Sequence, residues 1–145
     1  MAMNEDALFC VDQKAFIEKD DKVLILKTPE GELDFPGGKI QQGEARVGAM
    51  SSLTRSLQRE VMEETGLVID VFNPFAVWYY EFLNRERNAG KVVYLVAFKC
   101  KYVAGDVKLS NEHGQFRWVS RDDYHDVDDG SEYFDVLKKY FGAVS

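Results

Sequence analysis

Alternating apolar and polar residues predict strands in the first third of the chain. Residues 7–17 and 22–27 are rich in Val, Leu, Ile and Phe, and the polar residues 18–21 between them are typical of a hairpin turn. Residues 28–31, Thr-Pro-Glu-Gly, predict a second turn. These strands are expected to lead into the glycine pair Gly37-Gly38.

A helical period replaces this alternation in the middle of the chain. Leu53, Leu57 and Val61 recur on one helix face, at ~3.6 residues per turn. Ser52 stands directly before this stripe and is a strong N-cap residue. Gly66 suits the helix end, because glycine adopts the left-handed conformation without a steric penalty. The pattern predicts one helix that packs through one flank and faces a cleft with the other.

The chain then returns to a strand pattern. Residues 67–83 are rich in Val, Ile, Phe and Tyr, and Pro74 interrupts them, which predicts two strand pieces with an edge or a bulge at the proline. A charged turn at 84–90 and a long strand at 91–102 follow. This segment is expected to form a hairpin.

The last part of the chain predicts one strand and two helical segments. Residues 115–119 alternate like a final strand, and Ser120 can cap a short helical piece that begins at Arg121. Ser131 can cap a terminal helix whose apolar residues have helical spacing: Phe134, Leu137, Tyr140 and Phe141. The order of elements favours a mixed sheet between helices.

Composition narrows the class of protein. A chain of 145 residues with 46% hydrophobic residues is long enough for one packed domain, residues 1–145, and shows no internal repeat or linker. The net charge of −7 argues against binding to a nucleic-acid backbone. The acidic N-terminus and the lack of a long apolar stretch predict a cytoplasmic protein, in which Cys10 and Cys100 are reduced and buried.

Three carboxylates on the central helix are the strongest candidates for chemistry. Glu60, Glu63 and Glu64 stand at i, i+3 and i+4, so they crowd one helix face within a single turn. Like charges at this spacing repel each other, and a divalent cation between them removes the repulsion. Magnesium prefers oxygen ligands, so the spacing is compatible with a metal site as well as with a solvated helix edge.

Further residues around this cluster carry a family resemblance. Gly38, Glu44 and the segment Arg59-Glu60-Val61-x-Glu63-Glu64-x-Gly66-Leu67 resemble the Nudix box, G-x5-E-x7-R-E-U-x-E-E-x-G-U, in which U is aliphatic. The box has seven residues between its first Glu and its Arg, whereas this chain has fourteen, residues 45–58. The surplus is best placed at residues 45–51, as a lengthened loop or an extra helical turn.

The resemblance implies a fold, a reaction and a set of site residues. It implies an α/β fold, a Nudix-like α/β/α sandwich with a mixed central sheet, and a hydrolase that cleaves a pyrophosphate bond in a nucleoside diphosphate linked to another group. The implied Mg²⁺ or Mn²⁺ ligands are Glu60, Glu63, Glu64 and the Gly38 carbonyl. Arg59 would orient these glutamates, and Glu44 would support the site by pairing with Arg59.

The general base is left open between two sources. Glu112 lies in a loop before the last strand, where proteins resembling this one often place a metal ligand or a base, and Glu63 or another glutamate of the box is the alternative. His113 is interpreted as a bystander. The aromatic run at 78–82 is expected mainly to pack, with some rings available to stack on a base. Basic residues are candidates for phosphate contacts: Lys39, Arg85, Arg87 and Lys91.

Two other classes of function stay open from the sequence. A non-catalytic nucleotide-binding or regulatory module with the same fold would bind ligand without turnover. A structural protein with an acidic helix would show no effect of Mg²⁺ on its melting temperature. The substrate stays open among nucleoside triphosphates, ADP-ribose and nucleotide sugars, and exposed aromatic residues on the edge hairpin would suit a homodimer.

Overall fold

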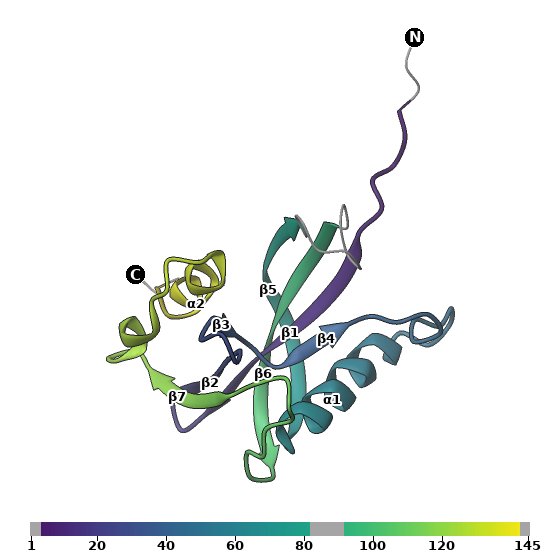
Figure 1. Ribbon diagram of the computed structural model, residues 1–145. Coiled ribbons are helices and arrows are strands. Elements are labelled where there is room, and N and C mark those ends of the chain that lie inside the picture. Colours follow the sequence, from purple (N-terminus) through teal and green to yellow (C-terminus); the bar gives the residue numbers. More distant parts are fainter. Residues whose placement is uncertain (1–3, 82–91, 143–145) are drawn as a thin grey trace.

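A mixed sheet with one long helix on each face forms the protein (Figure 1). The computed structural model describes residues 4–81 and 92–142. The strands are β1 (Cys10–Lys19), β2 (Lys22–Lys27), β3 (Leu33–Asp34), β4 (Gly37–Lys39), β5 (Val68–Glu81), β6 (Val92–Ala104) and β7 (Gln115–Ser120). The helices are α1 (Ser52–Thr65), the short 3-10 turn η1 (Tyr124–Val127) and α2 (Glu132–Gly142).

One parallel pair at the centre makes the sheet mixed. The strand order is β3-β2-β1-β6-β5, with β4 paired to β1 and β7 paired to β2. β1 runs parallel to β6, from the pair Cys10 and Val93 to the pair Glu18 and Lys101. The other pairs are antiparallel. The predicted mixed sheet between helices is therefore confirmed.

The hairpin of β5 and β6 forms as predicted, with one change. β5 is a single long strand, and its pairing with β6 shifts register on both sides of Pro74. Pro74 lacks an N–H and cannot extend the ladder, so it lies at an irregularity of the strand instead of dividing it into two pieces. The predicted turn at 84–90 lies outside the described residues.

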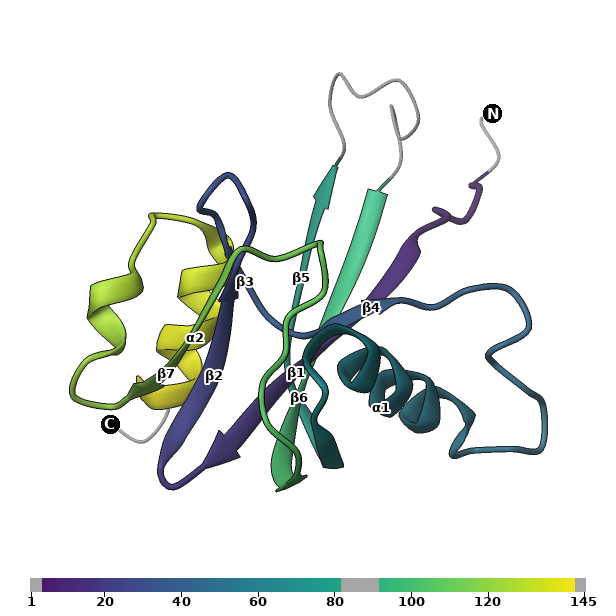
Figure 2. The same cartoon turned by 60° about the horizontal axis from the view of Figure 1, so that its bottom comes forward.

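Two views place the helices on opposite faces of the sheet (Figure 1, Figure 2). On the α1 face, Leu57 and Val61 belong to a buried cluster with Ala15 and Ile17 of β1. On the α2 face, the aromatic side chains of the terminal helix pack on Phe16 of β1. Alternate residues of β1 serve the two faces, because successive side chains of a strand point to opposite sides.

The beginning of α1 differs from the prediction. Ser52 is the first helical residue and not the cap, and Ser51 before it makes no side-chain cap bond. The Ser52 hydroxyl instead accepts a hydrogen bond from the Arg46 N–H, at 3.2 Å. Residues 45–51 form turns with a bridge between Arg46 and Ala49, so the lengthened loop is correct and the extra helical turn is wrong.

The ends of the two long helices are largely as predicted. Gly66 adopts a left-handed conformation with φ of 78°, and its N–H donates to the Met62 carbonyl at 2.9 Å. The Ser131 hydroxyl caps α2 by accepting from the Phe134 N–H at 3.3 Å. The short helical piece begins at Tyr124, three residues later than predicted. Within the described ranges, no helix is long and apolar enough to cross a membrane.

Candidate active site

The glycine pair lies directly against the carboxylates of α1. The Gly37 N–H donates to Glu64 Oε2 at 3.3 Å. A Cβ atom placed on Gly38 would be 2.6 Å from Glu60 Oε2, and one on Gly37 would collide with the Gln13 carbonyl. Glycine at position 37 thus permits the close approach of β4 to β1, and glycine at position 38 leaves room for the Glu60 side chain. The structure therefore brings Gly38, Glu60 and Glu64 close together.

Glu64 is a buried carboxyl group in a polar environment. Only 7% of the residue is exposed. Burial raises the pKa of the Glu64 carboxyl to about 7, although the positive charge of Lys14 and the Gly37 N–H oppose the rise. A buried carboxyl with a perturbed pKa beside a glycine loop is typical of a functional site.

Arg59 gathers the other carboxylates of the cluster. It donates to Glu44 at 2.5 Å, to Glu63 at 2.9 Å and to Glu60 at 3.2 Å. The predicted pairing of Glu44 with Arg59 is therefore present despite the longer connection between them. Arg59 is half exposed at the edge of α1.

Glu44 is held in place by three donors. The Ser56 hydroxyl donates to Glu44 Oε2, and the Gln41 N–H donates to Oε1 at 2.6 Å. These bonds, with Arg59, lower the pKa of Glu44 to about 2. Glu44 is thus an anchor for Arg59 and stays ionised.

The donor set fits a hard divalent cation, with some rearrangement. In the part of the chain that the structure describes, no three acidic, His or Cys side chains are already grouped as a metal site. Glu60 and Glu63 bond to Arg59 instead, so Glu63 must turn away from the guanidinium to join Glu60 and Glu64. The cluster offers only oxygen ligands, which Mg²⁺ prefers, and the missing Cβ of Gly38 leaves its backbone in contact with Glu60.

The loop with Glu112 is tied to this cluster. The Ser110 N–H donates to the Glu64 carbonyl at 3.0 Å, and the Gly114 N–H donates to the Lys27 carbonyl at 2.9 Å. Glu112 lies between these two anchors and is exposed. The structure thus places its loop beside the end of α1, and the role of Glu112 stays a prediction.

The sequence interprets His113 as a bystander, and its lack of a chemical role stays a prediction, but the structure does give the residue a specific partner. The residue is only 9% exposed, and its Nε2 lies 2.8 Å from Asp34 Oδ2. Burial lowers the pKa of His113, but the bond to the Asp34 carboxylate outweighs this and raises it. The bond was not predictable, because Asp34 and His113 are far apart in the sequence and only the fold brings them together.

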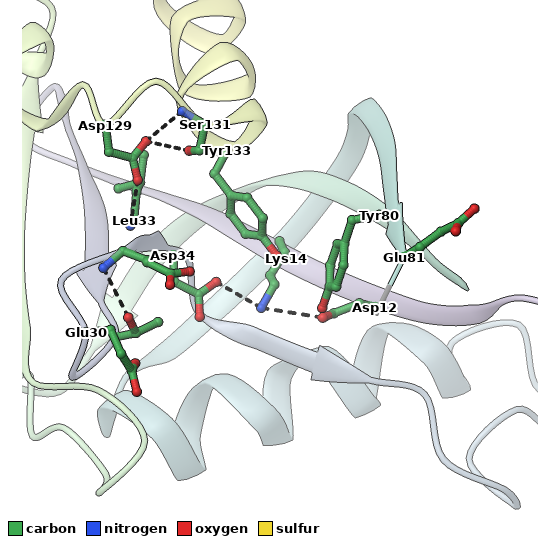
Figure 3. Close-up of a pocket in the computed structure, with 12 residues that line it drawn as sticks. Asp12, Lys14, Glu30, Leu33, Asp34, Tyr80, Glu81, Asp129, Ser131 and Tyr133 are labelled. Carbon is green, nitrogen blue, oxygen red and sulfur yellow. Dashed lines mark hydrogen bonds and ion pairs between the residues drawn. The ribbon is translucent and has the colours of Figure 1, made fainter. Parts of the chain in front are cut away.

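Sequence reasoning also missed a buried lysine with two acidic partners. Lys14 Nζ lies 3.1 Å from Asp34 Oδ1 and 3.6 Å from Asp12 Oδ2 (Figure 3). Burial disfavours the charge, but Asp34 and Asp12 raise the pKa of Lys14, which stays protonated. One signal was available, because Asp12 and Lys14 are two residues apart in an apolar strand and so share one face.

These charges line a pocket of about 770 Å³ between the sheet and the beginning of α2 (Figure 3). Two aromatic residues, Tyr80 and Tyr133, contribute to its wall. Its other lining residues are Asp12, Lys14, Thr28, Glu30, Glu32, Leu33, Asp34, Glu81, Asp129 and Ser131. In the aromatic run, Trp78 is buried and Tyr79 is exposed, whereas Phe82 and the candidates Arg85, Arg87 and Lys91 lie outside the described residues.

Comparisons with known proteins identify the family of this chain and the fold that it shares. The model of the NUDIX domain family matches residues 12–140. The MutT protein from Methanosarcina mazei Go1 has a similar structure, with a TM-score of 0.74, 26% identity and 97% of each chain covered. The search of curated proteins yields no match.

Two further structures share the fold at lower identity. A NUDIX hydrolase from Nitrosomonas europaea has a TM-score of 0.70 and 22% identity, with 94% of this chain and 90% of that chain covered. An Ap4A hydrolase from C. elegans has a TM-score of 0.69 and 20% identity, with 93% of this chain and 97% of that chain covered. At this identity, the likeness extends to the fold alone.

Proposed function

The chain belongs to the Nudix family, and we propose that it is a metal-dependent hydrolase that cleaves a pyrophosphate bond in a nucleoside diphosphate linked to another group. Nucleotide pyrophosphohydrolase activity is characteristic of the family. The observation that supports the proposal most strongly is the contact of Gly37 and Gly38 with Glu64 and Glu60.

Four groups would hold the cation: the carboxylates of Glu60, Glu63 and Glu64 and the carbonyl of Gly38. A bound Mg²⁺ or Mn²⁺ ion would neutralise the pyrophosphate oxygens and lower the pKa of a coordinated water. Arg59 supplies the positive charge beside Glu60 and Glu63 before the cation binds. Glu44 keeps Arg59 at the edge of the helix, so both are positioning residues.

Two carboxylates remain candidates for accepting the proton of the attacking water. Glu63 is exposed and one helix turn from Arg59, so it can turn toward the substrate. Glu112 belongs to the loop that is anchored to the Glu64 carbonyl. Either group meets the requirement that a general base lies within reach of the water.

The pocket beside Lys14 would receive the part of the substrate that carries no phosphate. Six of its lining residues are acidic and one is a lysine, so its charge disfavours phosphate groups and its two tyrosines favour a flat ring. Nucleoside triphosphates, ADP-ribose and nucleotide sugars all contain such a ring at the end of a phosphate chain.

A substrate panel tests the proposal. Phosphate-containing products are measured from these three substrate types with Mg²⁺ or Mn²⁺, for the unmodified protein and for Glu63→Gln and Glu64→Gln. Glu132→Gln is the matched control, because Glu132 is an exposed glutamate on α2. We expect turnover that both α1 variants lose and the control keeps.

Equal activity in all four proteins would refute the metal site. Metal-dependent binding of nucleotides without turnover of any panel member would instead support the alternative function, a non-catalytic nucleotide-binding or regulatory module.

A further inference from the structure

The pocket contains one buried carboxylate oxygen without a partner. Asp12 lines the pocket and is only 6% exposed. Its Oδ2 pairs with Lys14, but its Oδ1 is buried and has no hydrogen-bond partner among the described residues. Leaving such an oxygen unpaired costs free energy, so a ligand that donates a hydrogen to it is favoured.

The other carboxylates of the pocket do not present this feature. Asp34 uses Oδ1 for Lys14 and Oδ2 for His113. Asp129 accepts from the Leu33 N–H through Oδ2 and from Ser131 through Oδ1. The remaining three are exposed to water: Glu30, Glu32 and Glu81. Among the carboxylates that line the pocket, Asp12 is therefore the one with a buried oxygen that can still accept a hydrogen bond.

The position of Asp12 on the sheet relates it to the aromatic wall. Asp12 pairs with Leu95 on β6, which pairs with Trp78 on β5, so these residues form one row across a single face. Tyr80 is two residues beyond Trp78 and shares this face. Tyr80 and Asp12 lie side by side in the pocket (Figure 3). A flat ring of a ligand that stacks on Tyr80 would therefore lie close to Asp12.

We infer that Asp12 selects the substrate by accepting a hydrogen bond from the exocyclic amino group of a nucleobase. The inference rests on the proposed function for the identity of the ligand as a nucleotide. An amino group supplies two N–H donors and no charge. A keto group at the same place would direct lone pairs at a carboxylate, which is repulsive.

The negative surroundings strengthen this preference. Lys14 is the one cationic residue among those that line the pocket, and it is already bonded to two carboxylates. A site built to bond an N–H group strongly rejects the analogue that lacks it, because its acceptor is then left buried and unpaired. Asp12 is therefore expected to separate amino-bearing bases from their deaminated or unsubstituted counterparts.

Binding of nucleosides tests this inference separately from catalysis. Adenosine is compared with purine riboside, and guanosine with inosine, by NMR titration in buffer with EDTA. The unmodified protein is expected to bind the amino-bearing member of each pair about tenfold more tightly. The preference should fall to about twofold or less in Asp12→Ala and to an intermediate value in Asp12→Asn. Glu81→Gln, which removes a rim charge, should keep the full preference.

Folding of the variants is verified by their melting temperatures. Lys14 keeps Asp34 at 3.1 Å when Asp12 is removed, so the lysine is not left unpaired. If Asp12→Ala does not fold, the isosteric Asp12→Asn provides the comparison.

Two results would overturn the inference: equal affinities within each nucleoside pair, or a preference that survives loss of the Asp12 carboxylate. Each would leave turnover in the substrate panel intact. An Asp12-dependent preference without turnover of any nucleotide would support the inference and refute the proposed hydrolase.

Discussion

The two long helices cover opposite faces of one sheet, yet they bury different kinds of side chain. α1 buries two apolar residues, Leu57 and Val61, together with polar ones: Ser56, Glu64 and Thr65. α2 buries only apolar residues: Phe134, Val136, Leu137 and Phe141. A narrow apolar stripe thus attaches α1 to the sheet and leaves its charged edge accessible, whereas the buried residues of α2 serve packing alone.

The buried apolar clusters on the two faces of the sheet also differ, and the larger one lies on the α2 face. Among the described residues, the cluster on the α2 face contains seventeen buried apolar residues and the cluster on the α1 face contains nine. Hydrophobic stabilisation scales with the area buried, so most of it comes from the α2 face. We therefore expect changes on α1 to affect chemistry and changes on α2 to affect stability.

The largest contrast is expected for a ligand carboxylate. Glu60→Gln should lower kcat/KM by about 10²- to 10³-fold, because a neutral amide holds a divalent cation poorly and several kcal/mol of charge stabilisation are lost. Glu132→Gln on α2 should leave it unchanged. Steady-state rates at saturating Mg²⁺ measure both, and comparable losses in the two variants would break the contrast.

The reverse contrast is expected for the packed helix. Leu137 is fully buried, so Leu137→Ala should lower the free energy of unfolding by about 3 kcal/mol, through lost transfer energy and a cavity. Met62→Ala, at an exposed position of α1, should lower it by less than about 0.5 kcal/mol. Urea denaturation measures both values. A Met62 variant as unstable as the Leu137 variant would show that both helices are packed alike.

Because of Glu64 on α1, the free energy of unfolding of the protein should fall as pH rises. Its folded-state pKa of about 7 lies above its ordinary value of 4.5, so the folded protein binds the proton more tightly than the unfolded chain. This contribution to stability falls as pH rises from 4.5 to 7 and stays low above 7.

Glu64→Gln removes this pH dependence. In metal-free buffer at pH 8, the variant should be more stable than the unmodified protein by about 2 kcal/mol. The difference should disappear toward pH 4.5, and urea denaturation across this range measures it. A difference that does not change with pH would show that Glu64 is not a buried acid.

A methyl group at the glycine bend should lower activity more than stability. In Gly38→Ala, the new Cβ meets the Glu60 carboxylate at 2.6 Å, and the flexible side chain must move away from its ligand position. We expect about a tenfold loss of kcat/KM and a higher Mg²⁺ requirement. Gly142→Ala is the control, because nothing lies within 4 Å of the added Cβ. An equal loss of kcat/KM in Gly142→Ala would show that contact with Glu60 is not the cause of the loss in Gly38→Ala.

The smallest effect is expected at the edge of α1. Glu44→Gln should reduce kcat/KM by about threefold, because Arg59 keeps its bonds to Glu60 and Glu63 and the exposed ion pair is worth little. Raising the salt concentration should reduce the difference further. A loss of kcat/KM as large as that of Glu60→Gln would indicate that Glu44 binds the metal ion instead of only positioning Arg59.

Local patterns predicted much of this protein. The spacing of Glu60, Glu63 and Glu64, the helix end at Gly66 and the irregularity at Pro74 are properties of short segments, so residue type and period were sufficient. The cap at Ser52 was assigned wrongly for a related reason. Its hydroxyl bonds to Arg46 in the lengthened loop, and cap propensity contains no information on that loop.

Only the tertiary structure decided which distant residues meet. Asp12 and Lys14 come from β1, Asp34 from β3, His113 from a late loop and Tyr133 from α2, and their charges and rings converge where the sheet meets the helix. Burial on α1 raises the pKa of Glu64, and in the pocket Asp12 Oδ1 has no hydrogen-bond partner among the described residues. The reason is physical: hydrogen-bond partners, desolvation and the shape of a pocket depend on contacts between segments, whereas helix period, turn type and motif spacing depend on neighbours along the chain.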